Sequence, residues 1–173
     1  MSKQALLIID LQNDYFPQGK YPQYNSAQTL TNIEIAIKKA KQKNIPIIII
    51  QHRADVTQGL APFFNPDTLG VQIHPTILKA VPNTNIVIKN YADSFEQTNL
   101  EQVLQKHKIT ELLITGMMTQ NCITHTAISK EAEKYDVVIL VDCCTSVDEM
   151  IHNIALRALS TRVRLQNIEN VFN

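Results

Sequence analysis

Short apolar runs alternate along this chain with longer segments in which apolar residues recur at helical spacing. The runs are rich in Ile and Val and do not alternate with polar residues. Such uninterrupted runs are typical of parallel strands that helices cover on both faces. The pattern therefore predicts strands at residues 5–10, 45–51, 85–89, 111–116, 136–142 and, more weakly, 162–165.

Helix signals fill the segments between these strands, because Ser, Thr and Glu stand where the first turn of a helix prefers hydrogen-bonding side chains. The expected helices are residues 26–44 with Ser26 as N-cap, 98–108 with Thr98 and Glu101 as a capping box, 119–134, and 146–160 with Ser146 and Glu149 as a second box. This βαβ series predicts an α/β fold: one domain over residues 1–173, with three layers (α/β/α) and a mostly parallel sheet of about six strands.

Residues 52–84 break this rhythm with several Pro and Gly residues. Structureless loops of this length are uncommon in compact domains unless they have a function. We therefore expect this Pro-rich excursion to cover an active site or to contact another subunit.

Composition limits the classes of binding partner and indicates the cellular compartment of the protein. The chain has 16 Lys and Arg residues against 16 Asp and Glu residues, which gives no electrostatic footprint for nucleic acid or for a membrane surface. The N-terminal apolar run is too short for a secretory signal, and no run is long enough to span a membrane. Cys122, Cys143 and Cys144 are an odd set without CxxC spacing, and we expect Cys143 and Cys144 to be packed. These features predict a cytoplasmic protein with reduced thiols, whose partner is a small-molecule substrate or another protein.

Three reactive side chains stand at the ends of separate predicted strands. Asp10 closes the first strand, Lys89 closes the third, and Cys122 follows the fourth by a few residues. In an open α/β sheet, ligands bind outside the carboxyl ends of the strands. A carboxylate, an ammonium and a thiol at equivalent ends are therefore the first candidates for a site.

These three groups would suit acyl transfer. If Thr119 is an N-cap, Cys122 is the third helical residue, where the helix dipole and a nearby Lys89 would lower the pKa of the thiol. Asp10 could accept the thiol proton and later return it to a leaving amine. Taken singly, each residue has a plainer interpretation: a buried small residue for Cys122, a solvated strand end for Lys89, and a loop cap for Asp10.

Three segments resemble the signature segments of the isochorismatase-like cysteine hydrolases, the superfamily that includes nicotinamidases and N-carbamoylsarcosine amidase. They are "LLIIDLQNDYF" at 6–16, "IVIKNYADSF" at 86–95 and "LLITGMMTQNCITHTA" at 112–127, and "DTLGVQIHPTIL" at 67–78 is similar to the family's insertion before the lysine strand. The resemblance covers nearly the whole chain. It is specific for the family and much less so for the substrate.

The resemblance implies roles for particular residues. Asp10, Lys89 and Cys122 would form a catalytic triad, and a cis peptide bond would join Met117 to Met118. The N–H groups of Met118 and Cys122 would then form the oxyanion hole. The pocket residues implied by the family are Gln12, Tyr15, Tyr91 and Phe95, although ordinary packing is the alternative for each of them.

The sequence departs from the pattern of the nicotinamidases at the position of their metal site. Nicotinamidases carry a metal-binding Asp-x-His after the second strand, and the matching positions here are His52 and Ala54. His52 alone cannot rebuild that site, and whether it has any ligand role stays open. We expect no metal and no cofactor.

The expected function is cleavage of a C–N bond in a small amide or ureido compound through a thioester. Isochorismate cleavage needs no cysteine nucleophile, so Cys122 favours C–N hydrolysis. Two alternatives stay open: an isochorismatase-type vinyl ether hydrolase, and a non-catalytic family member that senses oxidants through its thiol.

The last expectation concerns the oligomeric state of the protein. Met150, Ile154 and Ala158 give residues 146–160 a broad apolar face, and members of this family commonly form oligomers. We expect a homo-oligomer, either a dimer or a tetramer.

Overall fold

The computed structural model describes residues 3–172, which are built around a six-stranded sheet. The strands pair in parallel in the order β3-β2-β1-β4-β5-β6. Their bounds are β1 Gln4–Ile9, β2 Ile47–His52, β3 Asn85–Lys89, β4 Glu111–Met117, β5 Asp136–Thr145 and β6 Arg164–Gln166. The predicted fold class, an α/β fold with a six-stranded parallel sheet, is confirmed.

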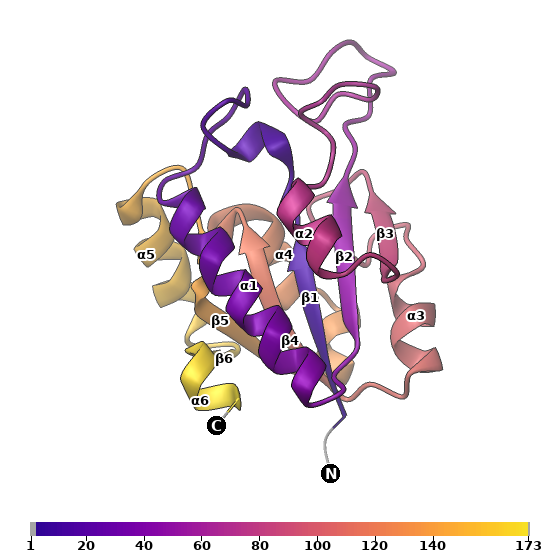
Figure 1. Ribbon diagram of the computed structural model, residues 1–173, viewed down its shortest axis with the longest axis vertical. Helices are drawn as coiled ribbons and strands as arrows, with labels where there is room; N and C mark the ends of the chain where they lie inside the picture. Colours follow the sequence, from indigo (N-terminus) through magenta and orange to yellow (C-terminus); the bar gives the residue numbers. More distant parts are fainter. Residues whose placement is uncertain (1–2, 173) are drawn as a thin grey trace.

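Helices cover both faces of this sheet, as uniformly apolar strands require (Figure 1). The bounds of the regular helices are α1 Ser26–Gln42, α2 Pro75–Ala80, α3 Leu100–Lys106, α4 Thr124–Ala127, α5 Glu149–Leu159 and α6 Ile168–Phe172. Buried residues of α1, α2 and α6 pack with one face of the strands, and those of α3, α4 and α5 pack with the other. Successive residues of β1 divide between the two cores, Leu6 and Ile8 on one side and Leu7 and Ile9 on the other.

The strand order reverses beside β1, which pairs with β2 on one side and with β4 on the other. The chain adds β2 and β3 outward on one side of β1 and then crosses to β4 on the opposite side. Such a switch point opens a crevice at the carboxyl ends of the strands. We therefore expect the functional site at the carboxyl ends of β1, β2, β3 and β4.

The predicted helix caps were wrong by one or two residues. Asn25, in a left-handed conformation, precedes α1 in place of Ser26, Asn99 precedes α3, and Asp148 caps α5 by accepting a hydrogen bond from the N–H of Ile151 at 2.8 Å. Ser146 instead contacts the side chain of Gln120. The Ser146 side chain is thus used in a tertiary contact, whereas the hydroxyl of Thr98 accepts from the N–H of Leu100 at 3.2 Å.

The helix expected over residues 119–134 is also wrong, because three short elements replace it. They are a single π-type turn, η2, at Thr119–Ile123, then α4, then a 3-10 turn, η3, at Glu131–Lys134. The hydroxyl of Ser129 accepts from the N–H of Glu131 at 3.3 Å, which starts a new turn where an α-helix would have continued.

The Pro-rich excursion lies over the carboxyl ends of the strands and contains α2 (Figure 1). Asp14, in a 3-10 turn, η1, at Asn13–Tyr15, helps to hold it there. The buried Asp14 carboxylate accepts hydrogen bonds from the N–H of Phe64 at 2.7 Å and of Lys20 at 3.1 Å. Gly70 is required beside it, since a Cβ atom at that position would lie 2.1 Å from the Asp14 carboxylate. Asp14 therefore ties two loops into one wall above the sheet.

Gly116 permits the close approach of β4 to β1. Its φ is +124°, and a Cβ atom there would lie 2.0 Å from the carbonyl oxygen of Ile9. We expect Gly116→Ala to lower the free energy of unfolding by at least about 2 kcal/mol, since strain and a backbone clash add. Urea denaturation would measure it.

Gly59 offers a matched control, because its φ is +114° but a Cβ atom at that position would meet no atom of residues 3–172 within 4 Å. Gly59→Ala should lower the free energy of unfolding by only about 1 kcal/mol, because the positive φ is its one source of strain. Equal losses of unfolding free energy in Gly116→Ala and Gly59→Ala would contradict the explanation that Gly116 is needed for the close approach of β4 to β1.

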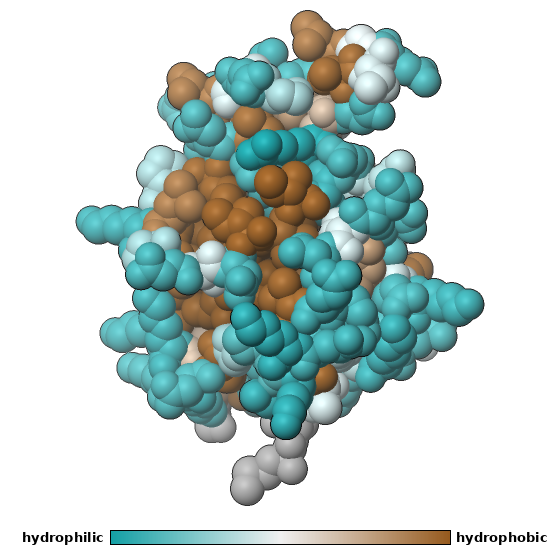
Figure 2. All heavy atoms as spheres, turned by 90° about the vertical axis from the view of Figure 1, so that its right-hand side faces the viewer, coloured by the Kyte–Doolittle hydropathy of each residue, from teal (hydrophilic) through white to brown (hydrophobic). Residues whose placement is uncertain are grey.

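Hydrophobic surface gathers on the side of the molecule where the edge strand β3 lies (Figure 2). Ile86 and Ile88 of that strand are 44% and 45% exposed, and Met150 and Ile154 of α5 are also exposed. Open strand edges and apolar faces are surfaces that pair with other chains. The homo-oligomer stays a prediction.

Two further sequence expectations concern burial and membranes. Cys143 and Cys144 are buried in β5, as predicted. Among the described residues, no helix combines the length and the apolar character needed to cross a membrane.

Candidate active site

Asp10, Lys89 and Cys122 meet at the carboxyl end of the sheet, although they are far apart in sequence. The ammonium nitrogen Nζ of Lys89 lies 3.0 Å from Oδ2 of Asp10 and 3.2 Å from Sγ of Cys122. The exposed fractions of the three residues are 0%, 1% and 3% in the order Asp10, Lys89, Cys122. The predicted convergence of the three side chains is therefore confirmed, and one cation joins a carboxylate to a thiol away from bulk water.

The sheet itself positions these groups. Asp10 follows β1 with φ of +56°, a left-handed conformation that Asp tolerates better than most residues. Its N–H donates to the carbonyl of Ile50 in β2 at 3.0 Å. Lys89 is the last residue of β3 and pairs in register with His52, the last residue of β2. Strand order and register therefore bring the ends of β1, β2 and β3 together.

Cys122 lies on the π-type turn η2 that follows β4. The N–H of Ile123 donates to the carbonyl of Met118 at 3.2 Å, five residues back. Thr119 was expected to be the N-cap, but its hydroxyl donates to the carbonyl of Thr145 at 2.9 Å and Met118 occupies the cap position. That expectation is wrong, and single π-type turns of this kind are frequent at functional sites.

The peptide bond between Met117 and Met118 is cis, as the family resemblance implied. It lies directly after β4, four residues before Cys122. The assignment of the Met118 and Cys122 N–H groups to an oxyanion hole stays a prediction.

The surroundings of Cys122 oppose the thiolate form. Burial raises the pKa of Cys122, the charge of Asp10 raises it further, and Lys89 only partly opposes them. Burial lowers the pKa of Lys89, but the charges of Asp10 and Cys122 outweigh burial and raise the pKa overall. The expectation that Cys122 has a lowered pKa is therefore wrong, because burial and the carboxylate outweigh the ammonium.

Two predicted pocket residues lie beside the cluster in buried positions. Tyr15 is buried against the ring of Phe64, with ring centroids 4.5 Å apart, and burial followed by the charges of Asp10 and Cys122 raises the pKa of its phenol. Gln12 uses its side-chain amide to hold backbone groups of His52 and Val71. The charges of the reactive groups therefore reach the phenol of Tyr15, whereas Gln12 joins β2 to the excursion.

The other two pocket residues differ from each other. The side chain of Tyr91 is exposed, and its backbone carbonyl accepts a hydrogen bond from Nζ of Lys89 at 3.1 Å. Phe95 is buried in the core of the α3 face and stacks on Tyr135 with centroids 6.2 Å apart. Substrate contacts by Gln12, Tyr15, Tyr91 and Phe95 stay predictions.

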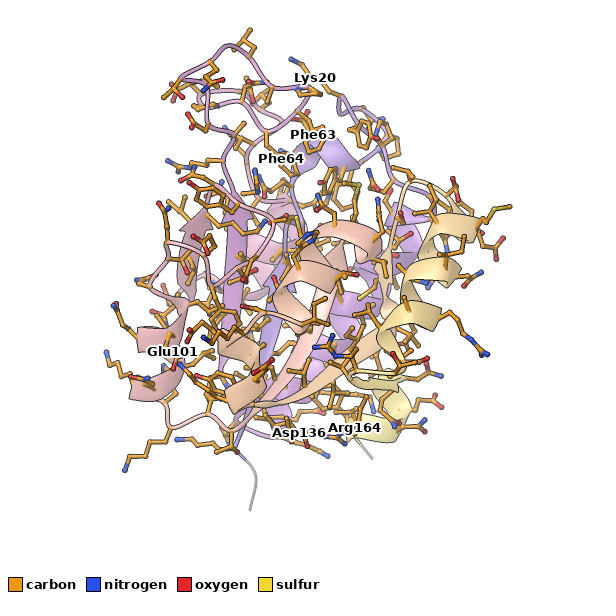
Figure 3. All side chains as sticks on the ribbon, turned by 180° about the vertical axis from the view of Figure 1, so that it is seen from behind. Lys20, Phe63, Phe64, Glu101, Asp136 and Arg164 are labelled. Atoms are coloured by element: carbon orange, nitrogen blue, oxygen red, sulfur yellow. The ribbon has the colours of Figure 1, made fainter. Side chains whose placement is uncertain are left out.

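Aromatic side chains form a wall over this site. Phe63 and Phe64 of the excursion lie above the strand ends, whereas Asp136 and Arg164 pair at the opposite end of the sheet (Figure 3). Phe64 is almost fully buried with φ of +59° and is held by Asp14. Sequence reasoning missed Asp14, because no local pattern links it to a loop about fifty residues later.

The residues present do not fit a nicotinamidase-type metal site. Within residues 3–172, the one group of three potential ligands close enough to share an ion is Asp10, His52 and Cys122, whose ligand atoms lie within 4.8 Å of one another. The ammonium of Lys89 already contacts all three, at 3.0 to 3.2 Å. A metal there would have to displace a buried, fully charged lysine.

Two further side chains of the excursion that could bind a metal, Asp55 and His74, have local partners. The carboxylate of Asp55 accepts from the N–H of Thr57 at 2.9 Å, and Nδ1 of His74 accepts from the N–H of Thr76 at 3.3 Å at the start of α2. Both side chains therefore complete turns of the excursion.

Comparison with known proteins agrees with this geometry. The family model for the isochorismatase domain matches residues 4–167. The uncharacterized isochorismatase family protein YddQ of Bacillus subtilis is 33% identical over 150 residues, which are 86% of this chain and 81% of that protein. The nicotinamidase of Escherichia coli is 25% identical over 86% of this chain and 85% of its own length.

A solved structure of an isochorismatase-like hydrolase from Alkaliphilus metalliredigens superposes with a TM-score of 0.87 at 22% identity, covering 99% of this chain and 98% of that one, and so shares the fold. The family match extends over all six strands and includes Asp10, Lys89 and Cys122. On these grounds the chain belongs to the isochorismatase family of hydrolases.

Proposed function

We propose that this protein is a cysteine hydrolase that cleaves a C–N bond of a small amide or ureido compound through a thioester. The observation that carries the proposal is the buried contact of one ammonium, that of Lys89, with both the Asp10 carboxylate and the Cys122 sulfur. A base beside a nucleophile, with a cation between them, is the arrangement that acyl transfer requires.

In the proposed reaction, Asp10 removes the proton from the Cys122 thiol as the sulfur attacks the substrate carbonyl carbon. A C–S bond forms and the carbonyl oxygen becomes an oxyanion, which the N–H groups of Met118 and Cys122 would stabilise. Asp10 then returns the proton to the leaving nitrogen, the C–N bond breaks, and an acyl thioester remains on Cys122.

Water completes the proposed cycle. Asp10 accepts a proton from a water molecule that attacks the thioester carbonyl, the C–S bond breaks, and the sulfur regains a proton. Lys89 keeps its positive charge throughout and stabilises whichever of its neighbours, the carboxylate or the thiolate, is negative. Its raised pKa supports this constant charge.

The choice of C–N hydrolysis over vinyl ether hydrolysis rests on the thiol. Cys122 is in direct contact with the ammonium of Lys89, and vinyl ether cleavage would have no use for that nucleophile. The similarity to a nicotinamidase supports an amide substrate, whereas the lack of Asp-x-His in the sequence after β2 argues against nicotinamide itself.

Ammonia release from a panel of small amides and ureido compounds would test this proposal. The wild-type protein, Cys122→Ala and Cys144→Ala should be compared, because Cys144 is also a buried cysteine but lies within β5. We expect turnover by the wild type and by Cys144→Ala, and none by Cys122→Ala. Ammonia release that persists in Cys122→Ala would contradict the thioester mechanism, and no ammonia release in any form would favour the vinyl ether or the thiol-sensing alternative.

Removal of metal is expected to leave this activity unchanged. Lys89 occupies the point at which Asp10, His52 and Cys122 would share an ion, so dialysis against EDTA should not reduce the rate of ammonia release. Loss of activity that zinc, manganese or iron restores would contradict this prediction and would raise nicotinamidase chemistry to the leading interpretation.

A further inference from the structure

His52 contacts the cluster directly, although the triad does not include it. Nδ1 of His52 lies 3.0 Å from Nζ of Lys89, as near as the Asp10 carboxylate is. The two residues are register partners at the ends of β2 and β3. Side chains directly opposite each other on neighbouring strands point to the same face, so the sheet itself sets this contact.

The backbone of His52 is fixed on both sides by one side chain. Gln12 donates from Nε2 to the carbonyl of His52 at 2.7 Å and accepts the N–H of His52 on Oε1 at 2.8 Å. Gln12 is fully buried. This paired contact removes freedom from the strand end, so the imidazole is presented to Lys89 from a rigid position.

Lys89 has more acceptors than protons. An ammonium carries three N–H groups, but four acceptor atoms lie within 3.2 Å of Nζ: Oδ2 of Asp10, Nδ1 of His52, the carbonyl oxygen of Tyr91 and Sγ of Cys122. While Cys122 is a thiol, the three better acceptors can take all three protons. When the sulfur becomes a thiolate, one N–H must turn towards it.

An imidazole can accept from an ammonium only on a nitrogen without a proton. Burial lowers the pKa of His52, and the charge of Lys89 lowers it further, whereas the charge of Asp10 and a hydrogen bond to the backbone of Tyr91 act in the opposite direction. The ionisable groups that face His52 are thus Lys89 from β3, Asp10 after β1 and Cys122 in η2. The neutral ring, with its proton on Nε2, is the form that matches this environment.

We infer that His52 is a positioning residue that holds Nζ of Lys89 through its unprotonated Nδ1. With Nζ fixed by His52 and the carbonyl of Tyr91, the third N–H can turn from Oδ2 of Asp10 to the Cys122 sulfur as the thiol proton passes to Asp10. Without His52, Nζ can move towards the carboxylate and away from the sulfur. This role rests on the proposed cysteine chemistry for its catalytic consequence, but the hydrogen bond itself does not.

Two substitutions separate the hydrogen bond from the rest of the side chain. In His52→Asn the amide oxygen can occupy the position of Nδ1 and accept, whereas His52→Leu keeps the bulk and offers no acceptor. On an amide substrate found in the panel, we expect His52→Leu to lower kcat about tenfold or more with little change in KM, and His52→Asn to stay within about threefold of wild type. Equal activity in His52→Leu and wild type, or equal losses in the two variants, would overturn the inference.

Nitrogen NMR of protein labelled in its histidine rings supplies a readout that needs no substrate. The His52 signals are those that vanish in His52→Asn, and His107→Asn at the end of α3 is the matched assignment control. We expect an unprotonated Nδ1 and a protonated Nε2 at pH 7. A proton on Nδ1 would refute the inference even if amide hydrolysis is found. If the wild type hydrolyses no amide, the proposed function fails, while the ring tautomer still decides whether His52 accepts from Lys89.

Discussion

Replacing Asp10 with Asn is expected to lower kcat/KM by roughly 10²–10⁴, the usual contribution of a positioned base. Asn has the same shape and also tolerates the left-handed φ of +56° at this position, so the fold should persist. The variant cannot take the proton from Cys122, whose pKa is raised by burial and by Asp10 itself. Steady-state kinetics on an amide substrate would measure the loss.

Asp142→Asn is a matched control for this substitution. Asp142 lies in β5, and its carboxylate accepts from the N–H of Ile168 at 3.2 Å, away from the cluster. Its kcat/KM should match that of the wild type. If Asp10→Asn also retained full activity, another group would have to be the base and the proposed mechanism would be lost.

Replacing Lys89 with Met is expected to lower the free energy of unfolding by about 3–5 kcal/mol, because it leaves a buried carboxylate without its cation. Asp10 has no exposed surface, and its Oδ1 has no hydrogen-bond partner among residues 3–172. Its Oδ2 is the atom that contacts the ammonium of Lys89, so this ion pair is the main compensation for the buried charge. Denaturation in guanidinium chloride at neutral pH would measure the change.

The double variant Lys89→Met with Asp10→Asn tests the cause of that loss. Removing the carboxylate charge as well should restore most of the stability, since a neutral pair leaves no isolated charge. The two substitutions would then show strong coupling in a double-mutant cycle. If the double variant were no more stable than Lys89→Met, lost packing of the lysine stem would be the better explanation.

Sequence patterns were sufficient for the strands and for the fold class. Uniformly apolar runs such as residues 111–116 can be stable only where both faces of a strand are buried, and this condition leads to a parallel sheet between helices. The three candidate side chains followed from the same source. Residues at strand ends share one edge of a parallel sheet, so Asp10 and Lys89 could be placed together before any distance was known.

Tertiary contacts decided where the helices begin. Ser146 was expected to cap α5, but its hydroxyl contacts Gln120, and Asp148 caps the helix instead. Capping preferences describe what a side chain can do locally, and they carry no information about a competing partner far away in sequence. Thr119 shows the same limit, because its hydroxyl donates to the carbonyl of Thr145 and does not cap a helix.

The direction of the Cys122 pKa shift also could not be predicted from the sequence. A thiol near a helix start and a lysine suggested a lowered pKa for Cys122, whereas burial and the nearby Asp10 raise it. Burial depends on how much chain lies above the site, and here the excursion held by Asp14 supplies that cover. The packing of the excursion over the site therefore determines that the pKa of Cys122 is raised and not lowered.

The sequence by itself determined the sheet, its apolar strands, the family and the three reactive side chains, because strand periodicity and residue type are local properties. Only the tertiary structure decided the register that sets His52 opposite Lys89, the Gln12 contact that fixes the end of β2, and the direction in which the pKa of Cys122 is shifted. These depend on distances between segments that are remote in sequence, and free energies of burial and charge follow from such distances.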